Sequence, residues 1–219
     1  MGEIRLPLTK RFMRLFFRLL YHPMAWSYDL VADTVSLGRW KDWVLAAASL
    51  TTGPRVLELG YGPGHLQVQL HKNQMVSIGL DESFQMARQA KRRLRKLGFQ
   101  PRLLRGIAQA LPFAGQSLDG VTATFPTPYI VDPQTLSEIA RVLRPGGRLV
   151  VLVGAWITGR SLPERVMSWL FETTGQSPPE DKEISGFVEP YQQAGFQARI
   201  RSVERPRSRL LFVIATRRA

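Results

Sequence analysis

Three glycines at alternate positions, preceded by an acid, make residues 58–64 the part of the sequence best suited to chemistry. The segment follows Val56-Leu57 and is Glu58-Leu-Gly60-Tyr-Gly62-Pro-Gly64. Glycines adopt positive φ angles and let a ligand approach bare backbone, and the amide groups of a following helix then face the crevice. Glu58 would repel a phosphate and attract an ammonium group. The pattern therefore predicts a strand, a tight turn and a helix start that bind a ligand with an ammonium group.

The spacing differs from that of other glycine-rich loops. It is not the Gly-x-Gly-x-x-Gly of a dinucleotide fingerprint, and no Lys-Ser/Thr pair follows as a phosphate loop requires. A second acid, Asp81, ends the apolar segment 75–80 and is followed by Glu82. A carboxylate at the tip of the second strand binds a ribose diol in nucleotide folds. Alternatively, Asp81 caps a helix that starts near Ser83, and both roles can hold together.

Four motifs, taken in order, resemble those of class I S-adenosylmethionine-dependent methyltransferases. They span roughly residues 50–155, and they are Glu58-Leu-Gly-Tyr-Gly-Pro-Gly64, Gly79-Leu-Asp81, Ala108-Gln-Ala-Leu-Pro-Phe113 and Leu143-Arg-Pro-Gly-Gly-Arg-Leu-Val150. The resemblance is strongest to the small group that methylates quinone precursors, lipids and other small molecules. It implies S-adenosyl-L-methionine as the cofactor and no metal.

The resemblance also implies which residues bind the cofactor. Tyr28 would reach its methionine end, unless it is a core tyrosine, and the Ala108 amide and the Gln109 side chain would address the adenine ring. Ile107 departs from the family, which usually has an acid at that position. The full predicted set is Tyr28, Glu58, Gly60, Gly62, Gly64, Asp81, Glu82, Ala108, Gln109 and Phe125.

For methyl transfer from a sulfonium, the protein must hold the two reactants in position, exclude water and at most remove one proton. A dedicated base is therefore optional. Tyr129, in the loop 126–132, is one candidate catalytic residue, which either orients a nucleophile or lines an apolar pocket. His65 is the other, just after the glycine turn, although a histidine at a helix start is more often inert. The absence of cysteine excludes thiol nucleophiles and disulfides, and the three scattered histidines form no metal-binding motif.

Apolar segments alternate with helical patterns, which predicts an α/β fold with a Rossmann-like, doubly wound, mostly parallel sheet. By resemblance the sheet has seven strands, of which the last is antiparallel. Gly146 and Gly147 are expected to cap the helix that precedes the fifth strand. The first expected strand is the apolar run 56–58, and the others cover 75–80, 103–106, 118–125, 148–153, 196–203 and 210–216. The expected helices cover 37–50, 83–97 and 133–143.

The length of 219 residues predicts one methyltransferase domain over 25–219, with 156–187 as a lid or substrate insertion that holds an apolar helix at 166–171. Residues 1–24 form a basic amphipathic helix. That helix either lies on an anionic membrane or packs over the cofactor pocket. No apolar run reaches the ~20 residues of a membrane span, and a cytoplasmic protein, peripheral at the inner face of the membrane, is expected.

The net charge of +13 favours an anionic partner. The apolar character of residues 1–24 and of the expected lid favours a small-molecule or lipid-like acceptor, whereas the net charge alone favours RNA methylation. Nucleic acid is the weaker hypothesis because no aromatic residues interleave with the basic run 88–96. A third hypothesis, suggested by Ile107, is a protein that binds the cofactor without catalysis.

Overall fold

The computed structural model describes residues 28–159, 161–162, 164–165 and 186–218, and its centre is a seven-stranded sheet in the order β3-β2-β1-β4-β5-β7-β6. Strands β1 to β5 pair in parallel, and β7 is antiparallel to both β5 and β6. The expected doubly wound sheet with an antiparallel last strand is therefore confirmed. The strands are β1 (Arg55–Leu59), β2 (Val76–Asp81), β3 (Leu103–Arg105), β4 (Leu118–Thr124), β5 (Leu143–Ile157), β6 (Phe196–Arg205) and β7 (Ser208–Arg217).

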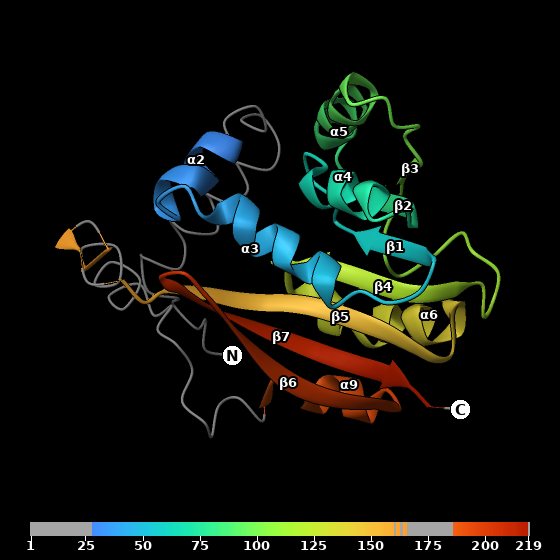
Figure 1. Cartoon of the computed structure of the whole chain (residues 1–219). Helices are drawn as coiled ribbons and strands as arrows, with labels where there is room; N and C mark the ends of the chain where they lie inside the picture. The colour runs from blue at the N-terminus through green and yellow to red at the C-terminus, as the bar shows by residue number, and fades with distance from the viewer. Residues whose placement is uncertain (1–27, 160, 163, 166–185, 219) are drawn as a thin grey trace, which may run out of the picture.

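Helices cover both faces of the sheet (Figure 1). One face carries α3 (Trp40–Ala46), η2 (Ala47–Ser49), α4 (His65–Lys72) and α5 (Phe84–Lys96), with α2 (Tyr28–Val35) beyond α3. The other carries α6 (Pro133–Val142) and α9 (Glu189–Gln193), and η3 (Pro128–Val131) joins β4 to α6. Each face buries a separate apolar cluster, one against α6 and α9 and one against α3 and α4. The sheet is thus a buried scaffold that holds the loops at its edges in place.

The starts of α5 and α6 follow from their local sequence. Ser83 is the N-cap of α5 and accepts a hydrogen bond from the backbone N–H of Met86, and Asp132 caps α6 in the same way, just before Pro133. Asp81 is therefore not the cap of α5, which corrects the alternative considered for it. A serine two positions closer to the helix takes that role and leaves the Asp81 carboxylate for other donors.

Strand β5 is longer than its apolar run indicates. It begins at Leu143, immediately after α6, and Gly146 and Gly147 lie within an irregular part of its pairing with β4. The expectation that these glycines cap α6 is wrong, because the C-cap is Leu143 in an extended conformation. A Cβ atom on Gly147 would lie 2.9 Å from the carbonyl oxygen of Arg144, so close packing requires a glycine there.

The expected lid begins later than residue 156, because β5 continues to Ile157 and pairs there with Ser208. The expected helix 166–171 and the leader 1–24 both lie outside the described residues. Within the described part of the chain, no helix is long and apolar enough to cross a membrane.

Candidate cofactor site

The glycine turn joins β1 to α4 at the point where the strand order of the sheet reverses, because β1 lies between β2 and β4. Gly60, Gly62 and Gly64 have φ angles of 65°, 51° and 83°. A Cβ atom on Gly64 would lie 2.8 Å from the Cβ of Ala90 on α5, whereas one on Gly62 would meet nothing within 4 Å. Gly64 therefore lets α5 pack against the turn, and Gly62 leaves bare backbone facing open space.

Asp81 ties the glycine turn to the end of β2. Its carboxylate accepts a hydrogen bond from the backbone N–H of Gly62 at 2.9 Å and another from that of Ser83 at 2.8 Å. Burial raises the pKa of Asp81 above its ordinary value, although these backbone bonds act in the opposite direction. A backbone hydrogen bond from Glu82 is a third one, and since an ionised carboxylate has about four lone-pair sites, acceptor capacity remains for a ligand.

Glu58 lies near the end of β1, just before the glycine turn, and it is buried. The sequence predicted that this carboxylate attracts an ammonium group. Its residue is 1% exposed, and its Oε2 accepts a hydrogen bond from Gln67 Nε2 at 2.8 Å. Burial raises the pKa of Glu58 to about 8, and the neighbouring Asp81 adds to the shift. Glu58 therefore holds a proton at neutral pH in the ligand-free chain, and a buried cation nearby would favour its ionised form.

A chain of hydrogen bonds leads from Glu58 to the surface of α4. Ser77 Oγ donates to Gln67 Oε1 at 3.0 Å and lies 2.9 Å from His71 Nδ1. Gln67 and Ser77 are fully buried. Sequence reasoning missed both, although a lone acid in an apolar strand needs a buried polar partner, and Gln67 is the polar residue between two apolar positions of α4.

Tyr61 and Arg93 also belong to the turn and were missed. Tyr61 is 3% exposed, and its hydroxyl is buried without a hydrogen-bond partner among the described residues. Its ring packs so closely on Gly79 that a Cβ there would lie 2.5 Å away. Arg93 donates to the carbonyl oxygen of Pro63. In the sequence Arg93 is only one of several cations in a basic run, whereas in the structure it fastens α5 to the turn.

Tyr129 is brought to the glycine turn, although it is far from it in sequence. Its hydroxyl lies 3.2 Å from the position that a Cβ on Gly60 would occupy. The short helix η3 places it there, with its ring against the apolar cluster of α6. His65 is the first residue of α4 and is half-buried. Both candidate catalytic residues therefore flank the turn.

Phe125 follows β4 directly and has a positive φ angle of 48°. Its ring stacks on Trp40 with centroids 4.5 Å apart and is tilted toward Trp43 at 6.4 Å. The Phe125 side chain is thus held against α3, so its predicted cofactor contact would come from its backbone or from one ring edge.

The remaining predicted residues lie on two loops and at the start of α2. Glu82 is exposed, and its carbonyl oxygen accepts a hydrogen bond from Arg105 Nε. Ala108 is buried in the α6 cluster, and the carbonyl oxygen of Gln109 accepts from Gln134 Nε2. Both follow β3. Tyr28 begins α2, and its side chain lies outside the described residues.

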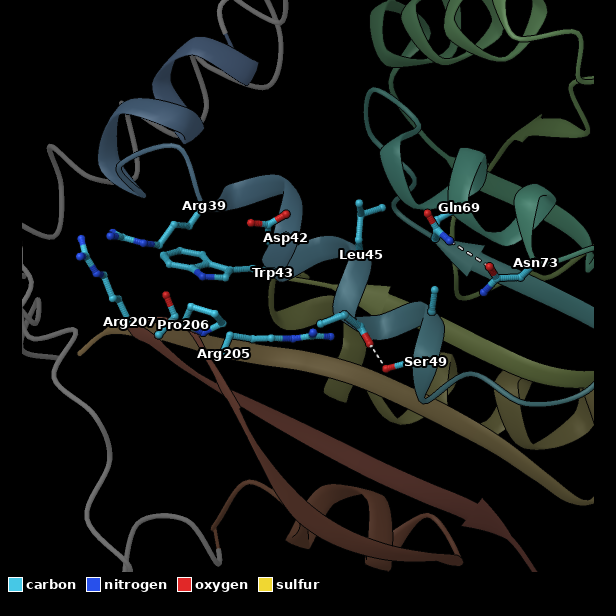
Figure 2. A pocket seen from close by; sticks show the side chains of 13 residues that line it. Arg39, Asp42, Trp43, Leu45, Ser49, Gln69, Asn73, Arg205, Pro206 and Arg207 are labelled. Carbon is cyan, nitrogen blue, oxygen red and sulfur yellow. Dashed lines mark hydrogen bonds between the residues drawn. The ribbon is translucent and has the colours of Figure 1, made fainter. Parts of the chain in front are cut away.

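A groove of about 530 Å³ lies on the other side of α3, away from the turn (Figure 2). It runs between α3, the end of α4 and the turn between β6 and β7, and Figure 2 shows the indole of Trp43 in it with Arg39, Arg205 and Arg207. Its described lining contains none of the predicted cofactor residues. The groove is therefore a separate feature and does not carry the chemistry of the turn.

The comparisons with known proteins agree with this geometry. A family model described as a methyltransferase domain matches residues 56–147, which include the turn, Asp81 and Tyr129. Residues 56–147 belong to the methyltransferase domain family. The methyltransferase domain therefore contains the candidate site, apart from Tyr28.

The curated relatives are quinone methyltransferases. A demethylmenaquinone methyltransferase from Renibacterium salmoninarum is 35% identical over 136 residues, which are 60% of this chain and 56% of that protein. A ubiquinone/menaquinone biosynthesis C-methyltransferase from Blochmanniella floridana is 32% identical over 142 residues, 61% of this chain and 56% of that protein. The chain thus spans a little over half the length of these relatives.

Solved structures confirm the fold of the methyltransferase domain. A SAM-dependent methyltransferase from Aquifex aeolicus has a TM-score of 0.55 at 20% identity, covering 81% of this chain and 89% of that one. A putative S-adenosyl-L-methionine-dependent methyltransferase from Methanococcus maripaludis has a TM-score of 0.60 at 16% identity, covering 86% and 90%.

Proposed function

We propose that this chain transfers a methyl group from S-adenosyl-L-methionine to a small, lipid-like acceptor of the quinone type. The observation that carries the proposal is the side-chain-free turn at 60–64, held open by the Asp81 carboxylate above the buried Glu58. The names of the curated relatives supply the class of acceptor.

The residues around the turn fit this cofactor. Gly62 faces open space, the Asp81 carboxylate keeps acceptor capacity for a ribose hydroxyl, and the Tyr61 hydroxyl is an unused polar group at the same place. Glu58 would stabilise the ammonium group from below by giving up its proton. Glu82, Ala108 and Gln109 stay assigned to the nucleoside end.

When bound, the cofactor supplies a methyl group that is already activated on a sulfonium, and the protein contributes position and a dry site. The acceptor atom forms one bond to the methyl carbon, the carbon–sulfur bond breaks with its electron pair left on sulfur, and the acceptor loses one proton. Tyr129 is the residue placed to orient the acceptor beside Gly60. His65, the second candidate catalytic residue, would receive the proton.

Two finer features are part of the proposal. Residues 1–24 form a basic amphipathic helix that brings the enzyme to the inner face of an anionic membrane, where lipid-like acceptors reside. The segment after β5, up to about residue 187, closes over the acceptor as a lid. Deleting residues 1–24 should weaken the binding of the enzyme to anionic vesicles but leave methylation of a detergent-dispersed acceptor intact.

The deciding experiment compares acceptors with a labelled methyl donor. A hydroxylated naphthoquinol dispersed in detergent should be labelled, and bulk tRNA should not. RNA methylation is the second candidate because the net charge is +13. Labelling of tRNA alone would replace the proposed acceptor, and cofactor binding with no labelling of any acceptor would favour a non-catalytic binding protein.

A further inference from the structure

Just over half of the large apolar side chains that stay exposed in the described residues lie at one edge of the sheet. Nine such residues are exposed in the described part of the chain, and Leu162 and Phe84 are the most exposed, at 77% and 56%. Five of the nine lie in segments beyond the carboxyl ends of the parallel strands: Val35, Phe84, Ile107, Val131 and Leu162.

The topology explains the gathering. Phe84 follows the end of β2, Ile107 follows β3 and Val131 ends the short helix after β4. Leu162 follows β5, and the carboxyl ends of parallel strands meet at the same edge. Figure 1 shows α2, which ends at Val35, beyond the same edge.

Cationic side chains lie among these apolar residues. The guanidinium of Arg88 lies over the Phe84 ring, 6.0 Å from its centroid. Arg105 is the last residue of β3. Arg207 lies in the turn between β6 and β7, where its carbonyl oxygen accepts from the N–H of Thr158, and its side chain is 67% exposed. The edge therefore combines exposed apolar groups with arginines.

We propose that this edge of the sheet docks on an anionic lipid bilayer, so that the mouth of the cofactor site faces the lipid. The inference rests on the proposed function, because a lipid-like acceptor would then enter from the membrane without crossing water. Apolar side chains beside arginines suit the boundary between lipid headgroups and acyl chains. There the apolar side chains enter the acyl region and the arginines bind anionic headgroups.

The composition of the edge favours a bilayer over RNA. Binding to single-stranded RNA uses aromatic side chains on which bases stack, together with a basic groove. Four of the five exposed apolar residues at this edge are aliphatic, and Phe84 is already covered on one side by Arg88. Aliphatic groups gain little from bases and much from acyl chains.

Vesicle flotation of the full chain tests the proposal. Phosphatidylcholine vesicles are compared with vesicles that contain about one third phosphatidylglycerol. The edge variant is Phe84→Ser with Leu162→Ser. The matched control is Val76→Ser with Leu97→Ser, because these two side chains are 41% and 51% exposed but lie at the opposite edge, at the start of β2 and just after α5.

The wild type and the control variant should float with the anionic vesicles to the same extent. The edge variant should partition at least about tenfold less, since it loses two inserted apolar groups. Equal flotation of the edge variant, equal loss in both variants, or no flotation of the wild type would overturn the proposal, and so would salt-sensitive binding to tRNA in place of vesicles. Circular dichroism confirms that each variant is folded.

The detergent assay separates this inference from the proposed function. A chain that methylates the dispersed quinol but does not float has the proposed activity without the docking edge. A chain that floats through this edge but methylates nothing has the edge without the activity. Dialysis against labelled S-adenosylhomocysteine should show that the edge variant still binds the cofactor product, which excludes a damaged cofactor site as the cause of weaker flotation.

Discussion

Replacing Glu58 with glutamine should remove a large part of the loss of stability that occurs as the pH rises from about 4.5 to about 8. In the folded chain burial raises the pKa of this carboxyl from 4.5 to about 8. The unfolded chain gives up the proton near pH 4.5, whereas the folded chain keeps it until about pH 8. The stabilising proton is therefore fully effective below pH 4.5 and is lost as the pH rises through 8.

The size of the effect follows from this shift in pKa. One pKa unit corresponds to about 1.4 kcal/mol, so the shift from 4.5 to about 8 lowers the free energy of unfolding by about 5 kcal/mol between pH 4 and pH 9. Glutamine keeps an acceptor for Gln67 Nε2, which donates to Glu58 in the wild type, and it does not titrate. The free energy of unfolding of the variant should therefore change less with pH, and it should rise relative to that of the wild type as the pH increases.

Urea denaturation at several pH values measures the difference directly. The control is Glu189→Gln at the exposed start of α9, whose profile should match that of the wild type. Parallel profiles for Glu58→Gln and the wild type would refute the assignment of a buried, protonated Glu58.

Three further variants and one matched control test the turn and its neighbours. Asp81→Ala should weaken binding of S-adenosylhomocysteine by about ten- to a hundredfold in calorimetry, because a charge-assisted acceptor is lost, and an unchanged affinity would remove Asp81 from the site. Gly64→Ala should lower the free energy of unfolding by roughly 2–4 kcal/mol, since it combines a positive φ angle with a contact to Ala90. Gly98→Ala has a similar φ angle but open space around it, so it should cost only about 1–2 kcal/mol, and equal losses would contradict the packing argument. Tyr129→Phe should lower kcat about tenfold with little change in cofactor affinity, and an unchanged kcat would leave the hydroxyl without a catalytic role.

The elements around the site could be predicted because their patterns are local. The apolar run before Gly60 and the proline that begins α6 each act within a few residues. The order of the strands and the place of the ligand crevice then follow from the general rules of doubly wound sheets.

What the sequence did not reveal depends on contacts between distant residues. The depth of Glu58, its partner Gln67 and the reach of Arg93 to Pro63 are set by how α4 and α5 pack. Gly146 matched a helix cap locally, but strand pairing extended β5 back to the end of α6. The stacking of Phe125 on Trp40 likewise depends on the packing of α3, and its contact with the cofactor stays a prediction.

Equilibrium dialysis of the wild-type chain against labelled S-adenosylhomocysteine is the most direct test of the cofactor site. The predicted result is saturable uptake of one molecule per chain, abolished in Gly62→Val, whose side chain would occupy the open space beside the turn. Absence of uptake by folded wild-type protein, or undiminished uptake by the valine variant, would contradict the account.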